Sequence, residues 1–250
     1  MLKNLYLQSI SNIERVTIYS ANHTEEKMGT NSLFDVIGPI MVGPSSSHTA
    51  GAAKLGKLAR QLVHGEIVEV KFILYDSFAR TYRGHGTGKA LLGGVMGYDL
   101  DSEELKHAEM IATYQGLKFS FEEGQKDGIH PNSVDIHLIE ASGKETILSG
   151  ASVGGGNVAI TSINGIETNL RTNLPAIVTH HRDRVGILSE ITDILAKRNL
   201  NIAGMNLYRD AFGKNAYMVV EIDETFDEAI SREIFESIDG IMDVFVLENR

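Results

Sequence analysis

The sequence pattern of the chain changes near residue 172. Glycine-rich turns are frequent up to about residue 156, where the run GASVGGGN (Gly150–Asn157) is the densest, and they become sparse further on. A chain of 250 residues also exceeds the usual size of one domain, about 100–200 residues. We therefore expect two domains, at residues 31–172 and 173–250. Residues 1–30 are polar and without clear periodicity, so we expect them to form a poorly ordered extension.

The second domain has the clearest secondary-structure pattern. Its apolar residues alternate in four short runs, as in strands, and recur at helical spacing in two longer runs. The expected elements are a strand at 176–179, a helix at 186–198, strands at 201–208 and 215–221, a helix at 227–238 and a strand at 241–247. This βαββαβ order is typical of a ferredoxin-like fold, in which both helices cover one face of an antiparallel four-stranded sheet. The stripe that its first helix should bury consists of Ile187, Leu188, Ile191, Ile194 and Leu195.

The first domain mixes helical and alternating segments. The patterns predict helices at 50–63, 88–96 and 102–114, and strands at 67–75, 117–121, 133–140 and 145–148. Val158, Ile160 and Ser162 alternate like a further strand, and the segment TNLRTNLP that ends at Pro175 is typical of a linker. The fold class is therefore α+β, and we expect the sheet of the first domain to be antiparallel.

Composition limits the kinds of partner that this chain can have. A net charge of -10 leaves no basic stripe for nucleic-acid phosphates, and no apolar stretch is long enough to span a membrane. The N-terminus lacks the pattern of a secretion signal, which favours the cytoplasm. The internal Met28 leaves open whether residues 1–27 belong to the native protein. The chain has no cysteine, so it supplies no thiolate to a disulfide or an iron–sulfur cluster.

The segment SLFDVIGPIMVGPSSSHTAG (Ser32–Gly51) offers the densest set of reactive groups. Its serines, histidine and threonine come directly before a predicted helix, where free N–H groups and hydroxyls can hold a small carboxylate or hydroxy amino acid. A purely structural interpretation is about equally strong: Ser46, Ser47 or Thr49 caps the helix, and His48 lies on the surface.

Two further polar turns carry histidine. YRGHGTGK (Tyr82–Lys89) contains His85 and Thr87, but it departs from the nucleotide-binding pattern G-x-x-x-x-G-K-[ST]. GIHPN (Gly128–Asn132) places His130 and Asn132 around a proline that restricts the backbone. Histidine can transfer protons near neutral pH, so we expect the three turns to converge on one cleft.

Taken together, these motifs resemble a known family. GPSSSHTAG (43–51), GHGTGKALLGG (84–94), GIHPN (128–132) and SVGGGN (152–157) are similar, in order and spacing, to the β chain of iron–sulfur-dependent L-serine dehydratases. The resemblance covers about residues 32–170. The remainder resembles an ACT domain, an amino-acid-sensing module, through RDRVGIL at 182–188. The first domain is also similar to the allosteric substrate-binding domain of some phosphoglycerate dehydrogenases.

The resemblance implies a complex that acts as an L-serine ammonia-lyase. A partner α chain would hold a [4Fe–4S] cluster, and an open iron would act as a Lewis acid on L-serine, which is converted to pyruvate and ammonia. On this chain the family implies no metal ligand and two catalytic residues, His48 and His130. The implied substrate-binding residues are Ser45, Ser46, Ser47, Thr49, His85, Thr87 and Asn132. The residues implied for an amino-acid effector of the ACT domain are Asp183, Val185 and Gly186.

Several alternatives stay open at this level. The base that removes the α-proton can belong to either chain, and the ACT domain can sense an amino acid or serve in dimerisation. A non-catalytic amino-acid-binding regulatory subunit is the alternative function. A pyridoxal-dependent enzyme ranks last, because Lys54, Lys57 and Lys89 lie in helical patterns without a recognisable Schiff-base setting.

Overall fold

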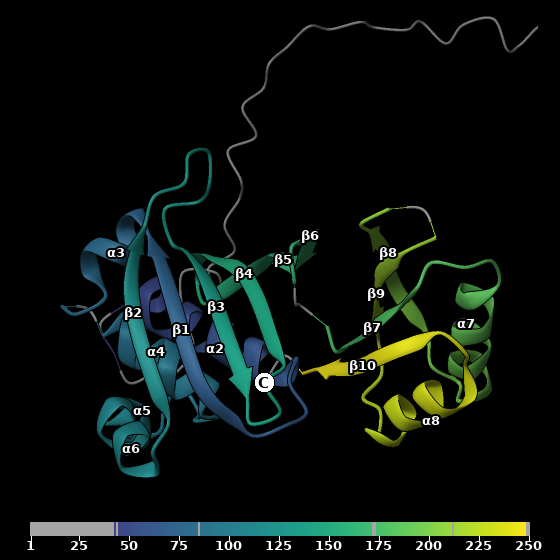
Figure 1. Ribbon diagram of the computed structural model, residues 1–250, viewed down its shortest axis with the longest axis horizontal. Helices are drawn as coiled ribbons and strands as arrows, with labels where there is room; N and C mark the ends of the chain where they lie inside the picture. The colour runs from purple at the N-terminus through teal and green to yellow at the C-terminus, as the bar shows by residue number, and fades with distance from the viewer. Residues whose placement is uncertain (1–42, 44, 85, 172–173, 212, 249–250) are drawn as a thin grey trace, which may run out of the picture. The chain divides into compact units, whose positions relative to one another are not determined.

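The computed structural model describes residues 43, 45–84, 86–171, 174–211 and 213–248. The expected extension at residues 1–30 lies outside this described part. The described residues form two sheets, a six-stranded one in the order β2-β1-β3-β4-β5-β6 and a four-stranded one in the order β10-β7-β9-β8 (Figure 1). The strands of the first sheet are β1 (Ile67–Tyr75), β2 (Lys118–Gly124), β3 (Ser133–Glu140), β4 (Glu145–Gly154), β5 (Asn157–Ile163) and β6 (Ile166–Arg171).

The first sheet is mixed, so the expectation of an antiparallel sheet was wrong at one position. β2 pairs with β1 in parallel, whereas the other neighbouring strands are antiparallel. The physical reason is the connection between β1 and β2, which runs through helices. Such a crossover returns the chain to the same end of the sheet and lets the next strand run in the same direction.

Helices cover one face of this sheet. They are η1 (Ser46–Ala50, one π-helical turn), α2 (Gly51–Gln61), α3 (Asp76–Thr81), α4 (Thr87–Val95), α5 (Glu103–Lys106) and α6 (Ala108–Gln115). Figure 1 shows α2 and α4 behind the strands. Leu55, Leu58 and Leu62 are buried there, as their helical spacing predicts. The single helix predicted at 102–114 is divided into α5 and α6, because the backbone departs from helical geometry at His107.

The segment expected to be a linker is partly a strand. Its residues Thr168–Arg171 belong to β6, which pairs with β5 at the edge of the sheet. Thr168 is buried and donates a hydrogen bond from Oγ1 to the carbonyl oxygen of Ile160 at 3.1 Å. The glycine-rich run at 150–157 contains the turn between β4 and β5, as expected for such a run.

The second sheet has the ferredoxin-like arrangement that its pattern predicts. Its elements are β7 (Ala176–Arg182), α7 (Ile187–Lys197), β8 (Ile202–Arg209), β9 (Asn215–Ile222), α8 (Ala229–Ser237) and β10 (Ile241–Leu247). All neighbouring strands are antiparallel. Of the predicted stripe on α7, Ile187, Ile191, Ile194 and Leu195 are buried and Leu188 packs at their margin. These side chains of α7 pack with those of α8 and of one face of the sheet to form one hydrophobic core.

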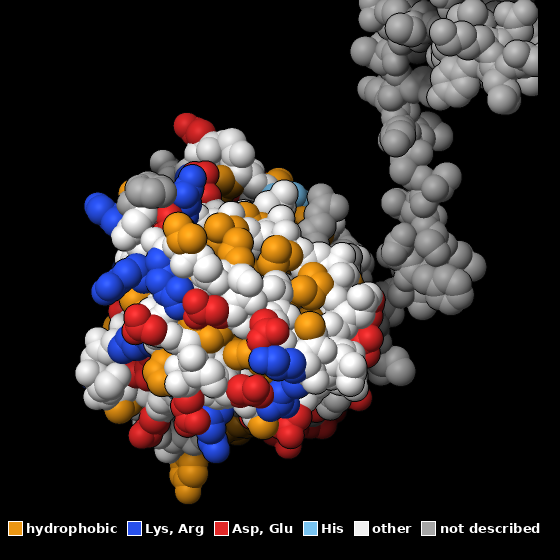
Figure 2. Space-filling view, turned by 90° about the vertical axis from the view of Figure 1, so that its right-hand side faces the viewer, with side chains coloured by type: hydrophobic (Ala, Val, Ile, Leu, Met, Phe, Trp, Pro, Cys, Tyr) orange, Lys and Arg blue, Asp and Glu red, His pale blue; other side chains and the backbone are white. Residues whose placement is uncertain are grey.

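Part of the other face of the second sheet is also buried. Val178, Val219 and Phe245 belong to the same hydrophobic cluster as the core of the first sheet. Over the face seen in Figure 2, acidic and basic side chains lie interspersed. Among the described residues, helices of the length and apolar character that a membrane span requires are not found.

Candidate functional site

Ser45 caps the helix that follows the serine-rich loop. Its backbone is extended, and its Oγ accepts a hydrogen bond from the backbone N–H of His48 at 3.2 Å. The prediction that Ser46, Ser47 or Thr49 would cap the helix was therefore wrong. Because the helical turn η1 begins at Ser46 rather than at Ala50, Ser45 is the last extended residue and occupies the capping position.

His48 is held between two elements instead of lying free on the surface. Its Nε2 is 3.1 Å from Oγ of Ser77, at the start of α3, and its Nδ1 is 3.4 Å from Oγ of Ser45. The ring packs on Phe78, with 5.5 Å between ring centroids and 60° between ring planes. The imidazole is half-buried, and both of its nitrogens face hydroxyl groups that can exchange protons with it.

The GIHPN turn is anchored to the same region. The carbonyl oxygen of Pro131 accepts a hydrogen bond from the backbone N–H of Ser77 at 2.9 Å, and that of Asn132 accepts one from Ser152 N–H at 3.0 Å. His130 is exposed, and its Nδ1 accepts a hydrogen bond from Asn132 N–H at 3.1 Å. Ser77 therefore contacts both the His48 turn and the His130 turn.

Three hydroxyl groups near the start of α2 and α4 are buried. Thr49, Thr87 and Ser152 have 3%, 0% and 0% of their surface exposed, and their hydroxyls make no hydrogen bond with any described residue. A Cβ atom placed on Gly51 would lie 2.0 Å from Oγ of Ser152, so the start of α2 lies directly on β4. Helix α4, which begins at Thr87, packs against η1. Buried hydroxyls without a partner are costly, at about 1–3 kcal/mol each, and they mark this region as unusual.

The structure thus brings together most of the residues that the sequence singles out in the first domain. Ser46 and Ser47 lie half-buried in η1, beside Thr49 and His48. His85 lies outside the described residues. Sequence reasoning missed Ser77 and Ser152. A signal for Ser77 was present, since it follows closely after the strand predicted at 67–75, but its distance from His48 along the chain concealed the contact.

A cleft of about 390 Å³ lies beside His130, within the size range of small-molecule sites. Tyr75 donates a hydrogen bond from its hydroxyl to Oδ2 of Asp135 at 2.6 Å in this cleft. Burial, followed by the hydrogen bond and negative charge of Asp135, raises the pKa of Tyr75 well above its ordinary value. The phenol therefore remains a hydrogen-bond donor at neutral pH. The other polar residues that line the cleft include Lys126, Ser133, Ser149, Ser162, Glu167 and Thr168.

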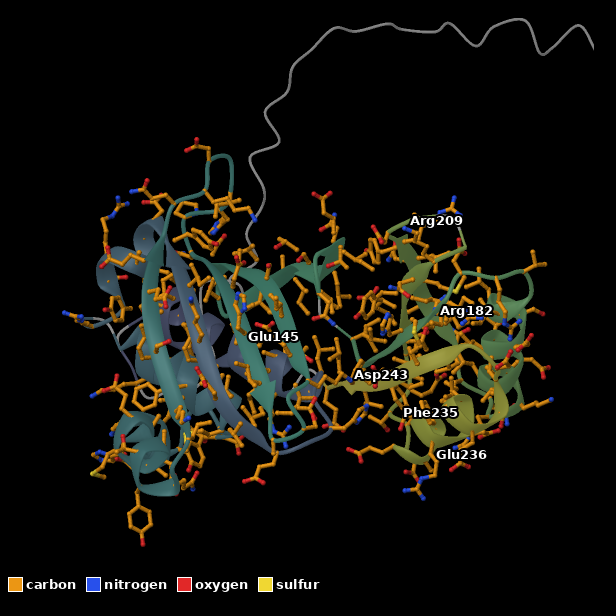
Figure 3. All side chains as sticks on the ribbon, viewed as in Figure 1. Glu145, Arg182, Arg209, Phe235, Glu236 and Asp243 are labelled. Atoms are coloured by element: carbon orange, nitrogen blue, oxygen red, sulfur yellow. The ribbon has the colours of Figure 1, made fainter. Side chains whose placement is uncertain are left out.

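The three residues expected to bind an effector lie in the turn between β7 and α7. Oδ2 of Asp183 accepts hydrogen bonds from Gly213 N–H at 3.1 Å and from Arg209 at 3.3 Å, and these contacts lower the pKa of the Asp183 carboxyl. Figure 3 labels Arg209 near the end of β8. Val185 is almost fully exposed, and Gly186, the N-cap of α7, has a φ of 91°. Asp183 thus joins this turn to the end of β8 and to the connection that follows it. Val185 and Gly186 leave the start of the helix accessible.

Comparison with known proteins agrees with both parts of the structure. The family described as "Serine dehydratase beta chain" matches residues 32–117, and the family described as "AHAS small subunit-like ACT domain" matches residues 177–245.

Two curated relatives match most of this chain over nearly their whole length. The chain is 41% identical over 207 residues to the probable L-serine dehydratase, beta chain, of Bacillus subtilis (strain 168), which covers 83% of this chain and 94% of that protein. It is 37% identical over 204 residues to the L-serine dehydratase, beta chain, of Peptoniphilus asaccharolyticus, with 81% and 92% covered. D-3-phosphoglycerate dehydrogenase of Synechocystis is 26% identical over 79% of this chain but only 35% of its own length. The chain therefore belongs to the serine dehydratase β-chain family and carries an ACT-like domain at its C-terminal end.

Proposed function

We propose that this chain is the β subunit of an L-serine ammonia-lyase and that a partner α chain holds a [4Fe–4S] cluster. The two relatives that match most of the chain are named as a probable L-serine dehydratase β chain and an L-serine dehydratase β chain, which supports the substrate. The donor groups of this chain do not fit such a cluster, because the chain has no cysteine and its loops offer hydroxyls and imidazoles. Thiolate ligands would then come from the α chain.

One observation carries the proposal: the imidazole of His48 lies between two serine hydroxyls, next to the turn that contains His130. Conversion of L-serine to aminoacrylate removes the α-proton and the hydroxyl group, so that one water leaves, and a second water then releases ammonia and forms pyruvate. An imidazole nitrogen can accept or return the α-proton. The hydroxyls of Ser46 and Ser47 can donate hydrogen bonds to the substrate carboxylate. We assign proton handling to His48 and substrate contact to the exposed ring of His130.

The test is to co-express the chain with a cysteine-bearing α chain under anaerobic conditions and to measure pyruvate formed from L-serine. We expect His48→Ala and His130→Ala to lower turnover about 100-fold or more while the iron content of the complex stays unchanged. His107→Ala is the matched control, because His107 is exposed at the junction of α5 and α6. A wild-type complex that holds its cluster but makes no pyruvate would contradict the proposal.

A second function, amino-acid sensing, is favoured by the exposed start of α7 in the ACT-like domain. Val185 and Gly186 leave that helix start open, and N–H groups there can bind a carboxylate. Calorimetry of the isolated chain with L-serine separates the two functions. Tight binding by the chain alone, combined with an inactive complex, would favour a regulatory subunit over a catalytic one.

A further inference from the structure

Ser77 contacts both the turn that carries His48 and the GIHPN turn that carries His130. Its Oγ lies 3.1 Å from Nε2 of His48, and its backbone N–H donates to the carbonyl oxygen of Pro131 at 2.9 Å. The side chain thus holds one turn while the backbone holds the other. His48 and Ser77 are 29 residues apart in the sequence, so this contact depends on the tertiary packing that brings η1 to the start of α3.

We propose that Ser77 is a positioning residue, which fixes the orientation of the His48 imidazole for the lyase reaction. This inference rests on the proposed function. A neutral imidazole carries its proton on one nitrogen, and the hydrogen-bond partner of the other nitrogen decides which one. Ser45 lies 3.4 Å from Nδ1 and Ser77 lies 3.1 Å from Nε2, so the shorter contact is the one that Ser77 makes.

The backbone around Ser77 is held independently of His48. Asp76, which precedes it, has a φ of 42°, a conformation uncommon for residues other than glycine. Such strain persists where neighbouring contacts enforce it. Thr81 donates a hydrogen bond from Oγ1 to the carbonyl oxygen of Ser77 at 2.6 Å, and Ser77 N–H is bonded to Pro131. The hydroxyl of Ser77 is therefore presented to the imidazole from a fixed point.

The first test uses the complex with the α chain. Ser77→Ala keeps the backbone N–H that binds Pro131 and removes only the hydroxyl. We expect kcat to fall about 10- to 100-fold, as for a misplaced catalytic group, with KM and iron content unchanged and with an altered dependence of kcat on pH. Ser77→Thr keeps a hydroxyl and should restore the wild-type kcat and its dependence on pH. Ser189→Ala, on the exposed face of α7, is the matched control.

The second test does not need activity. The nitrogen NMR signals of the His48 ring are measured in the full-length chain alone, and we expect Ser77→Ala to change the proton distribution between Nδ1 and Nε2 while Ser77→Thr leaves it unchanged. An inactive wild-type complex would count against the proposed function. An active wild-type complex whose Ser77→Ala variant keeps the kcat, the pH profile and the His48 signals of the wild type would overturn the role of Ser77.

Discussion

Nζ of Lys144 lies 3.0 Å from Oδ2 of Asp243, which joins the turn between β3 and β4 to the last strand, β10. His64 and His180 each place a ring nitrogen 3.8 Å from the same carboxylate. His64 comes from the region after α2 and His180 from β7, so one acidic residue links four segments. Figure 3 labels Asp243 on β10.

The first prediction is that Asp243→Asn destabilises the chain more at neutral pH than in acid. Burial acts to raise the pKa of Asp243, but the nearby ring of His180 and the hydrogen bond from Lys144 outweigh it and lower the pKa overall. A carboxyl with a lowered pKa stabilises the folded state above its unfolded pKa of about 3.9. That contribution is lost as the pH falls through the folded value. We expect a loss of about 1 kcal/mol at neutral pH.

Urea unfolding of the wild type and the variant at several pH values measures this difference. Asp101→Asn is the control, because Asp101 is exposed. A stability difference between Asp243→Asn and the wild type that stays constant between pH 7 and pH 3 would show that the charge of Asp243 contributes nothing to it.

The second prediction concerns the close approach of α2 and α4. A Cβ atom on Gly94 would lie 2.1 Å from the carbonyl oxygen of Ala53, whereas one on Gly84 would meet no atom within 4 Å. Gly94→Ala should therefore force the helices apart and lower the free energy of unfolding by about 1–3 kcal/mol. Gly84→Ala should change it by less than about 0.5 kcal/mol. Equal urea midpoints for the two variants would mean that the helices pack less closely in solution.

Local patterns predicted the second domain well because each of its elements buries one clear face. The stripe on α7 and the alternation in its strands determine which side chains point inward, and the βαββαβ order leaves few ways to pair the strands. The sheet order β10-β7-β9-β8 confirms that fold.

Other features depend on contacts that no local pattern carries. The parallel pair β1–β2 was missed because alternation does not reveal the direction of a neighbouring strand. β6 was mistaken for a linker because an edge strand can contain polar residues such as Thr168 and Asn169. Ser77 resembles an ordinary residue at a helix start, and only the packing of η1 brings it to His48.

The third prediction tests the helix cap in the serine-rich loop. Ser45→Ala removes the oxygen that accepts the N–H of His48 and should lower stability by about 1 kcal/mol. Ser46→Ala is the matched control, because Ser46 is the neighbouring half-buried serine and lies inside η1. Thermal unfolding compares the two variants. A larger loss for Ser46→Ala than for Ser45→Ala would place the cap one residue later.

The fourth prediction concerns Tyr75 in the cleft beside His130. Burial raises the pKa of this phenol, as do the hydrogen bond to Asp135 and the negative charge of that residue. A raised pKa stabilises the folded state below the ordinary tyrosine value of 10.0, and this stabilisation is lost as the pH rises through the folded value. Tyr75→Phe should cost about 1.5–3 kcal/mol at neutral pH, because the Asp135 carboxylate loses its donor.

An alkaline titration followed by tyrosinate absorbance distinguishes Tyr75 from the other tyrosines. Tyr114→Phe is the matched control, because Tyr114 is 92% exposed. Tyr75→Phe should leave the early part unchanged and remove absorbance only where the protein begins to unfold. Loss of an early-titrating phenol in Tyr75→Phe would mean that the hydrogen bond between Tyr75 and Asp135 is broken in solution. These two residues would then not form the wall of the cleft together.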